Sequence, residues 1–293
     1  MTVPYLWRMS FPARPDTAED LAGALGPFCA SVAWFEVSAS EWRVEGITAA
    51  EPNRDAVVNA VGQAAWRLGI PAPRLHVALV PPADWAAANL STFKPVAVGR
   101  YFVHGSHFGG PLPPGRIALA LDAGMAFGSG EHATTAGCLA VLDDLARRRR
   151  FLNALDLGCG SGILAFAMAR TWPAHVLAVD IDPEAVAVAR ENARRNRLAA
   201  RIRFAVGNGM AAPLVRDRAP YDLIAANILA RPLVRMAGAV AAALAPGGVA
   251  VFSGLIVADA PWVEAAAHAH GLGRVRRVVR DGWATLVLER GRG

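Results

Sequence analysis

Residues 154–165 read Ala-Leu-Asp-Leu-Gly-Cys-Gly-Ser-Gly-Ile-Leu-Ala, a pattern in which an apolar strand turns through closely spaced glycines into an apolar helix. Glycine permits a sharp turn and lets the backbone approach a ligand closely, because it has no Cβ. The next apolar run, residues 176–179, ends at Asp180, where the second strand of such a unit meets the hydroxyls of a ribose. Together the two stretches predict a βαβ unit that binds a nucleoside at the edge of a parallel sheet.

The spacing of the loop glycines helps to choose between two cofactors. Gly158, Gly160 and Gly162 follow the pattern G-x-G-x-G. A dinucleotide enzyme needs G-x-G-x-x-G to place a diphosphate at the start of the helix, and here Ile163 stands where the last glycine should fall. S-adenosylmethionine has no phosphate and needs only close backbone contact with its amino-acid and ribose portions. The loop therefore favours S-adenosylmethionine over NAD, and a purely structural glycine turn is the third interpretation.

Several polar positions around this unit are candidate cofactor contacts. Asp156, at the end of the first strand, can receive the cofactor's ammonium directly or through water, and Asp180 can bind the ribose. After the predicted strand 202–206, Asn208 can accept a hydrogen bond from the adenine amino group, and Met210 can cover the adenine ring. An ordinary turn is an equally good interpretation of this Asn-Gly pair.

The predicted strand 221–227 carries the candidate for the reacting centre. It ends in Asn227, and ligands of open α/β sheets collect beyond the carboxyl ends of the strands, so we expect this side chain to face the transferred group. The alternative is that Asn227 caps the following helix. Methyltransferases of bases and of glutamine have Asn-Pro-Pro-Tyr or a close variant here, whose aromatic ring stacks on a planar target. Both prolines and the ring are missing from this chain, which favours a flexible, non-planar amine as the methyl acceptor.

A second glycine-rich stretch precedes the predicted helix that runs to about residue 145. At this point the chain resembles the PrmA family, the bacterial methyltransferases of ribosomal large-subunit protein eleven. The resemblance rests on Phe127-Gly-Ser-Gly-Glu-His-Ala-Thr-Thr135, the 156–162 loop, Asp180-Ile-Asp-Pro183, Asn227-Ile-Leu-Ala230 and the interdomain stretch Phe93-Lys-Pro-Val-Ala-Val-Gly-Arg100. It covers most of residues 84–290 and, by the order of elements, the small N-terminal domain.

This resemblance implies methyl transfer from S-adenosylmethionine to amines of a ribosomal large-subunit protein, on lysine side chains, the N-terminal α-amine or both. Carried over by motif, the cofactor contacts fall on Thr135, Gly158, Asp180 and Asn227. Three positions near the expected site depart from the family, which usually has Thr, Thr and Pro where this chain has Ser129, Glu131 and Ala133. Glu131 in particular can alter the choice of acceptor.

Methyl transfer from a sulfonium is an in-line displacement, so the enzyme chiefly has to align a neutral amine and exclude water. We expect Asn227 and neighbouring backbone carbonyls to orient the amine, with Glu131 or His132 as proton acceptors. For His132, a helix cap or a packing residue is an equally good interpretation. No metal is expected, because His104 and His107 have no further ligand at a suitable spacing.

The order of elements predicts two domains. The first eighty residues read as strand, helix, two strands, helix and strand, the order of the ferredoxin-like α+β fold, and we expect residues 1–80 to recognise the substrate. Residues 81–115 are rich in Pro and Gly and are expected to link the domains. Residues 116–293 alternate strands and helices, which predicts a Rossmann-like α/β methyltransferase domain with a mostly parallel seven-stranded sheet. Its last two strands flank Asp281-Gly282, a hairpin signal that makes one strand antiparallel.

Composition limits the classes of protein. The chain has 54% hydrophobic and 18% charged residues, so it can bury a substantial core. It shows neither a signal peptide nor a membrane-spanning run, and we expect a cytoplasmic protein without membrane contact. The net charge is +6, so indirect contact with ribosomal RNA is a further expectation. The arginine run 147–150 is either a solvated face or a phosphate-binding patch.

Two other functions are open at this point. The first is a methyltransferase that acts on another protein lysine or on RNA; the basic charge supports RNA, and the missing stacking ring after Asn227 opposes it. The second is a binding module that keeps the fold without catalysis. The complete glycine loop and Asp180 argue against this second alternative.

Overall fold

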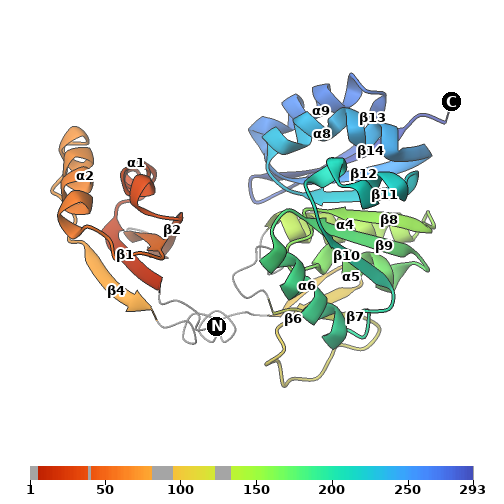
Figure 1. Ribbon diagram of the computed structural model, residues 1–293, viewed down its shortest axis with the longest axis horizontal. Coiled ribbons are helices and arrows are strands. Elements are labelled where there is room, and N and C mark those ends of the chain that lie inside the picture. Colours follow the sequence, from red (N-terminus) through yellow and green to blue (C-terminus); the bar gives the residue numbers. More distant parts are fainter. Residues whose placement is uncertain (1–5, 39–40, 81–94, 123–132, 293) are drawn as a thin grey trace. The chain divides into compact units, whose positions relative to one another are not determined.

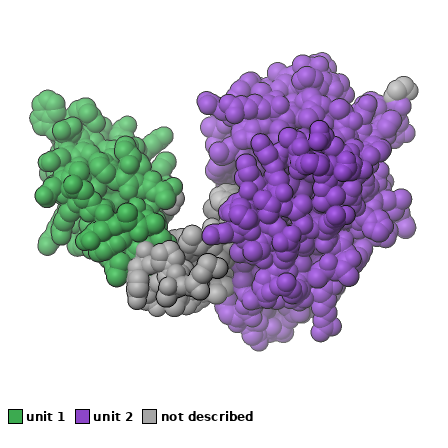
Figure 2. All heavy atoms as spheres, viewed as in Figure 1, with its two compact units in different colours: residues 1–88 green, residues 89–293 purple. Residues whose placement is uncertain are grey.

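The computed structural model describes residues 6–38, 41–80, 95–122 and 133–292. The chain divides into two compact units, residues 1–88 and 89–293, which are coloured separately in Figure 2. The described part of each unit has a hydrophobic core of its own. Among the described residues, no helix has the length and the apolar character that crossing a membrane requires.

The first unit is a four-stranded antiparallel sheet with two helices. Its elements are β1 (Leu6–Ala13), α1 (Ala18–Leu25), the 3₁₀ turn η1 (Gly26–Phe28), β2 (Ser31–Ser38), β3 (Glu41–Thr48), α2 (Arg54–Arg67) and β4 (His76–Val80). The strand order β2-β3-β1-β4 is that of the ferredoxin-like fold, so this part of the predicted fold class is confirmed. Helix α2 begins after Asn53, whose Oδ1 accepts a hydrogen bond from Ala56 N at 3.1 Å.

One face of this sheet packs on the helices. Met9 and Phe11 of β1 are 0% and 1% exposed and belong to the same core as Leu21 of α1 and Val57 of α2. Residues at every second strand position share a face, so these apolar side chains lie together while their strand neighbours face the other side. The alternation of apolar residues along β1 therefore builds this core.

The described residues of the second unit form a seven-stranded sheet, whose order can be followed in Figure 1. Its strands are β8 (Asn153–Leu157), β9 (His175–Asp180), β10 (Ile202–Val206), β11 (Tyr221–Asn227), β12 (Leu244–Ile256), β13 (Leu272–Arg280) and β14 (Trp283–Arg290). They are arranged β10-β9-β8-β11-β12-β14-β13, and among these strands β14 alone runs in the direction opposite to the other six. The predicted Rossmann-like class, a mostly parallel sheet with one antiparallel strand, is confirmed. Asp281 and Gly282 form the predicted hairpin turn, both with positive φ (47° and 78°).

Helices cover both faces of this sheet. They are α4 (Ala133–Ala146), α5 (Ile163–Thr171), α6 (Pro183–Arg195), α7 (Pro213–Asp217), α8 (Ala230–Ala243) and α9 (Ala260–His268), with the 3₁₀ turns η2 (Gly209–Ala211) and η3 (Val257–Asp259). Residues of α4, α5 and α6 share one core with the sheet, and residues of α7, α8 and α9 share the other. Two apolar layers therefore enclose the strands, as their continuous apolar runs predicted.

Part of the predicted linker, 81–115, is not a simple connection. It contains β5 (Val96–Val98) and β6 (Tyr101–His104), which form a three-stranded sheet with β7 (Ile117–Ala120). Tyr101 is 0% exposed, and its hydroxyl lies 2.7 Å from Thr171 Oγ1 of α5. These strands could not be predicted from the sequence, because three or four residues beside a glycine give too short a pattern to detect. Residues 81–94 lie outside the described part of the chain.

Candidate active site

The glycine loop between β8 and α5 has the backbone conformation that its sequence requires. Gly158, Gly160 and Gly162 have φ values of 72°, 50° and 91°, a left-handed region that side chains with a Cβ rarely adopt. At Gly158 an added Cβ would also lie 2.5 Å from Cγ2 of Ile228, the residue after Asn227. The loop and the end of β11 are therefore in direct contact.

The amides of this loop bind the protein itself. Gly158 N and Cys159 N both donate to Val179 O, at 2.8 and 3.0 Å, and Gly162 N donates to Cys159 O at 2.8 Å. Gly160 N donates to Asp180 Oδ2 at 2.8 Å. A diphosphate site needs backbone amides that point at the ligand, and it would not place a carboxylate among them. These contacts fit a nucleoside without phosphate and argue against a dinucleotide.

Asp156 lies under helix α5 rather than at an open surface. It is 1% exposed, and its Oδ2 accepts a hydrogen bond from Ala165 N at 2.8 Å. Burial raises its pKa to about 7, opposed by that hydrogen bond and assisted by the charge of Asp180. The side chain thus ties the strand to the helix that follows the loop. The contact with a cofactor ammonium that the sequence suggested stays a prediction.

Asp180 occupies the predicted place at the end of β9. Its Oδ2 accepts from Gly160 N, and its Oδ1 accepts from Asp182 N at 3.0 Å. The residue is half-buried. Each carboxylate oxygen has a second lone pair, so Asp180 can hold the loop and still accept hydrogen bonds from ribose hydroxyls.

Asn227 is held by the first turn of α4. Its Nδ2 lies 3.4 Å from Thr134 Oγ1 and 3.3 Å from Thr135 Oγ1, and both threonines are buried. Its Oδ1 is buried and has no hydrogen-bond partner among the residues that the structure describes. Leu229, not Asn227, stands at the N-cap of α8, so the helix-cap alternative for Asn227 is wrong. A buried acceptor without a partner is costly, and such atoms often mark a place where a ligand donor binds.

Two buried asparagines that the sequence analysis missed join the site to the β7 end. Asn192 Nδ2 donates to Ser161 O at 3.1 Å and to Asp122 O at 3.0 Å, which links the glycine loop to the chain beyond β7. Asn196 Nδ2 donates to Ala120 O at 2.6 Å, and its Oδ1 accepts from Ala120 N at 2.9 Å. Their spacing of four residues on an arginine-rich helix was the available signal, since it places both on one face.

The remaining predicted positions are less informative. Asn208 is exposed and does not cap the following 3₁₀ turn, so its side chain is open to a ligand. Met210 is 6% exposed and belongs to the apolar core under α7 and α8, which gives it a packing role. Glu131 and His132, the predicted proton acceptors, lie outside the described residues.

Cys159 sits in the loop but has the environment of an unreactive thiol. It is 6% exposed, and burial, followed by the charges of Asp156 and Asp180, raises its pKa. A reactive cysteine needs neighbouring positive charge that stabilises the thiolate. The small size of the side chain accounts for its place beside the cofactor loop.

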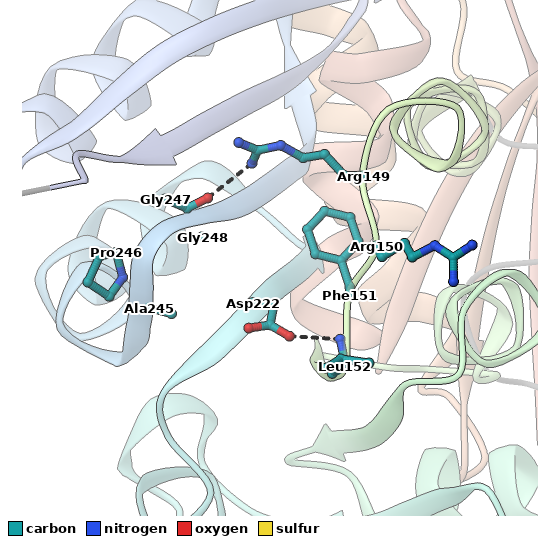
Figure 3. Close-up of a pocket in the computed structure, with 9 residues that line it drawn as sticks. All are labelled: Arg149, Arg150, Phe151, Leu152, Asp222, Ala245, Pro246, Gly247 and Gly248. Atoms are coloured by element: carbon teal, nitrogen blue, oxygen red, sulfur yellow. Dashed lines mark hydrogen bonds between the residues drawn. The ribbon is translucent and has the colours of Figure 1, made fainter.

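The arginine run, residues 147–150, lies where the parallel strands begin, whereas Asn227 lies where they end. Arg147, Arg148 and Arg149 form ion pairs with Asp143, Asp144 and Glu289, respectively. A cavity of about 310 Å³ is lined by Arg149, Arg150, Phe151, Leu152, Asp222 and residues 245–248. Figure 3 shows Arg149 turned toward Gly247 O and Asp222 toward Leu152 N, while Arg150 extends away from them. Ligands of such sheets bind at the carboxyl edge, so we place no site at this cavity.

The strand order, the glycine loop and the acidic end of the second strand together define the class I fold of S-adenosylmethionine-dependent methyltransferases. A family model described as ribosomal protein L11 methyltransferase (PrmA) matches residues 30–291, and the chain belongs to this family.

Named relatives agree with this assignment. The chain is 46% identical over 236 residues to a ribosomal protein L11 methyltransferase of Rhizobium etli (strain CIAT 652), with 80% of this chain and 81% of the relative covered. It is 45% identical over 210 residues to one of Brucella suis (strain ATCC 23445 / NCTC 10510), with 72% and 74% covered. The crystal structure of a ribosomal protein L11 methylase of Lactobacillus delbrueckii subsp. bulgaricus is similar with a TM-score of 0.60 and 26% identity, covering 68% of this chain and 98% of that one.

Proposed function

We propose that this protein transfers methyl groups from S-adenosylmethionine to amines of ribosomal protein L11, on lysine side chains, the N-terminal α-amine or both. The observation that carries the proposal is the unpartnered, buried Oδ1 of Asn227, next to a glycine loop whose amides already bind the chain. The relatives' names support the acceptor, since each is called a methyltransferase or methylase of this ribosomal protein.

The residues of the site fit S-adenosylmethionine. When bound, it supplies a methyl group on a positively charged sulfur. We assign the ribose hydroxyls to the carboxylate of Asp180, which lies beside the loop, and the adenine amino group to Asn208, which is exposed. The carboxylate of Asp180 beside the glycine loop suits a cationic ligand better than a phosphate. Gly158 keeps the loop close to Ile228 and so brings the cofactor half of the site next to Asn227.

Asn227 is the group we assign to the acceptor amine. Its Nδ2 is fixed by Thr134 and Thr135, and this leaves its Oδ1 to accept an N–H of the amine and direct the nitrogen lone pair. A lysine amine must first lose a proton, which costs about 4.6 kcal/mol at neutral pH, whereas an α-amine costs about 1 to 1.4 kcal/mol. A dry site lowers this cost because it disfavours the charged form. We keep Glu131 and His132 as proposed proton acceptors.

We propose that the ferredoxin-like domain, residues 1–80, recognises the acceptor protein and that residues 116–293 perform the transfer. The relatives are named for a protein substrate, and binding a protein needs more surface than a pocket for one amine. Deletion of residues 1–80 is expected to leave cofactor binding intact and to abolish methylation of the protein. Loss of both together would contradict this division. Because the acceptor is part of the ribosome, we also place the enzyme in the cytoplasm.

The test of the function is direct. The purified chain is incubated with S-adenosylmethionine labelled on the methyl carbon and with recombinant L11, and the labelled residues are found by mass spectrometry. We expect label on amines of L11, and Asn227→Ala as a control should lose it while the fold is kept. In a lysate from a strain without the enzyme, label confined to RNA would overturn the proposed acceptor. Label on another protein's lysine would replace L11 as the substrate.

Contact with ribosomal RNA is a separate proposal that rests on the net charge of +6. Binding driven by phosphates weakens steeply as salt increases. If RNA assists the reaction, methylation of L11 within ribosomal particles should decrease with salt more steeply than methylation of free L11. Equal salt dependence would remove RNA from the list of partners.

A further inference from the structure

Two hydroxyl side chains are buried behind Asn227. Ser253 of β12 and Thr285 of β14 are 0% and 2% exposed, and their side-chain oxygens lie 2.9 Å apart. Ser253 Oγ is also 3.3 Å from the carbonyl oxygen of Thr134 and 3.4 Å from that of Ala284. Burying hydroxyls is costly unless they are hydrogen-bonded, and the contacts of Ser253 and Thr285 meet this requirement. The proposed chemistry makes no direct use of either group.

Ser253 contacts both elements that hold Asn227. In the parallel pairing of β11 with β12 it is the register partner of Asn227, and its carbonyl oxygen accepts from Ile228 N at 3.1 Å. Its hydroxyl meets the carbonyl of Thr134, the residue whose own hydroxyl contacts Asn227 Nδ2. The contacts form a closed ring from β11 to α4, to β12 and back to β11.

Helix α4 is shaped to receive the pair. A Cβ added at Gly137 would lie 2.4 Å from Thr285 Oγ1, so only glycine leaves room for this hydroxyl. Glycine within a helix disfavours the helix relative to alanine, so its presence here needs a local reason. Thr134, through its carbonyl oxygen, and Gly137 are therefore the residues of α4 that meet the hydroxyl pair.

We infer that Ser253 and Thr285 are positioning residues for methyl transfer, which fix the first turn of α4 so that Thr134 and Thr135 aim Asn227 Oδ1 at the acceptor amine. The inference rests on the proposed function and adds to it a specific support behind the reacting centre. Small errors in the placement of a reacting group lower a rate greatly, while binding of either substrate depends on many other contacts. The pair should therefore affect kcat and leave the affinities nearly unchanged.

The experiment compares three variants of the full chain. Thr285→Val removes the hydroxyl and keeps the shape, whereas Thr285→Ser keeps the hydroxyl and removes a methyl group. The matched control is Tyr221→Phe, which removes another buried hydroxyl bond, to Val215 O at 2.8 Å, at the opposite end of the strand that carries Asn227. The measurements are kcat and KM for L11, the dissociation constant of S-adenosylmethionine by calorimetry, and Tm.

For Thr285→Val we expect kcat to fall about tenfold or more, with the KM for L11 and the cofactor dissociation constant within about threefold of wild type. Thr285→Ser should keep kcat within about threefold, and Tyr221→Phe should lower Tm without changing kcat. Wild-type kcat in Thr285→Val, or an equal loss in Thr285→Val and Thr285→Ser, overturns the inference.

If Thr285→Val does not fold, Ser253→Ala is judged by the same criteria, since it keeps the backbone bond to Ile228. An active wild type with unaffected variants refutes only this positioning role. A wild type that does not methylate L11 refutes the proposed function, and the positioning role with it.

Discussion

The glycine loop and the end of strand β11 lie against each other and differ in how their polar groups are satisfied. In the loop, the amides of Gly158, Cys159, Gly160 and Gly162 all bind the chain, and so do the carboxylates of Asp156 and Asp180. At the end of β11, two threonine hydroxyls hold the amide nitrogen of Asn227, but its Oδ1 is buried without a partner.

The polar groups of the glycine loop are thus satisfied within the chain, whereas the end of β11 has an acceptor that needs a ligand. A loop whose donors are satisfied keeps its shape and offers mainly its surface and the free lone pairs of its carboxylates. An orphaned acceptor costs about 1 to 3 kcal/mol, which a donor on the bound substrate can offset. We therefore assign cofactor binding to the loop and orientation of the acceptor amine to Asn227, and each prediction below tests one side of this division.

The largest effect is expected at Asn227. Asn227→Ala should lower kcat about 10²- to 10³-fold, because a preorganised polar group at the reacting centre is lost. Tm should not decrease, since the substitution also removes an unsatisfied buried atom. Label incorporation into L11 measures the loss of rate, and calorimetry with S-adenosylmethionine measures whether the affinity for the cofactor is kept. A loss of cofactor affinity as large as the loss of rate would assign Asn227 to the cofactor half instead.

The next largest effect is expected at Asp180. Asp180→Ala should weaken cofactor binding by about 1.5 to 3 kcal/mol, the range for a hydrogen bond to a charged group. The control is Asp182→Ala, which removes the N-cap of α6 and should reduce stability with much less effect on the dissociation constant. Unchanged affinity in Asp180→Ala would mean that the ribose binds elsewhere.

The third prediction concerns the pH dependence of stability. The pKa of Asp156 is raised from 3.8 to about 7, chiefly by burial, so in this range the folded chain binds a proton that the unfolded chain releases. The contribution of Asp156 to the free energy of unfolding is thus fully present below pH 3.8 and is lost as pH increases through about 7. In the wild-type protein, the free energy of unfolding measured with urea should therefore decrease with pH by about 1 kcal/mol per pH unit in this range. Asp156→Asn should lack this decrease, because an amide does not titrate. Identical slopes in the two proteins would show that Asp156 ionises normally.

The smallest effect is expected at Asn208. If its side chain accepts from the adenine amino group, Asn208→Ala should weaken cofactor binding by about 1 kcal/mol, roughly fivefold. Stability should not change, because the residue is exposed and caps no helix. Calorimetry that shows no change would favour the ordinary-turn interpretation of this position.

Much of the fold could be predicted because its signals are local. The apolar runs of β8, β9 and β11, the cap at Asn53 and the Asp281-Gly282 turn are visible in a few neighbouring residues each. Strands β5 and β6 were missed because they have only three and four residues and are defined by their partners. In the site, Asp180 and Asn227 could be chosen because each ends a recognisable strand.

The sequence by itself determined the class of the protein, since glycine spacing, strand-end carboxylates and family motifs are properties of contiguous residues. Only the tertiary structure decided which polar groups form hydrogen bonds within the chain and which remain available to a ligand. Asn192, Ser253 and Thr285 read as ordinary polar residues until their burial and their partners, 31 to 119 positions away, are known. The physical reason is that burial and hydrogen-bond satisfaction depend on segments brought together by folding, which no local pattern records.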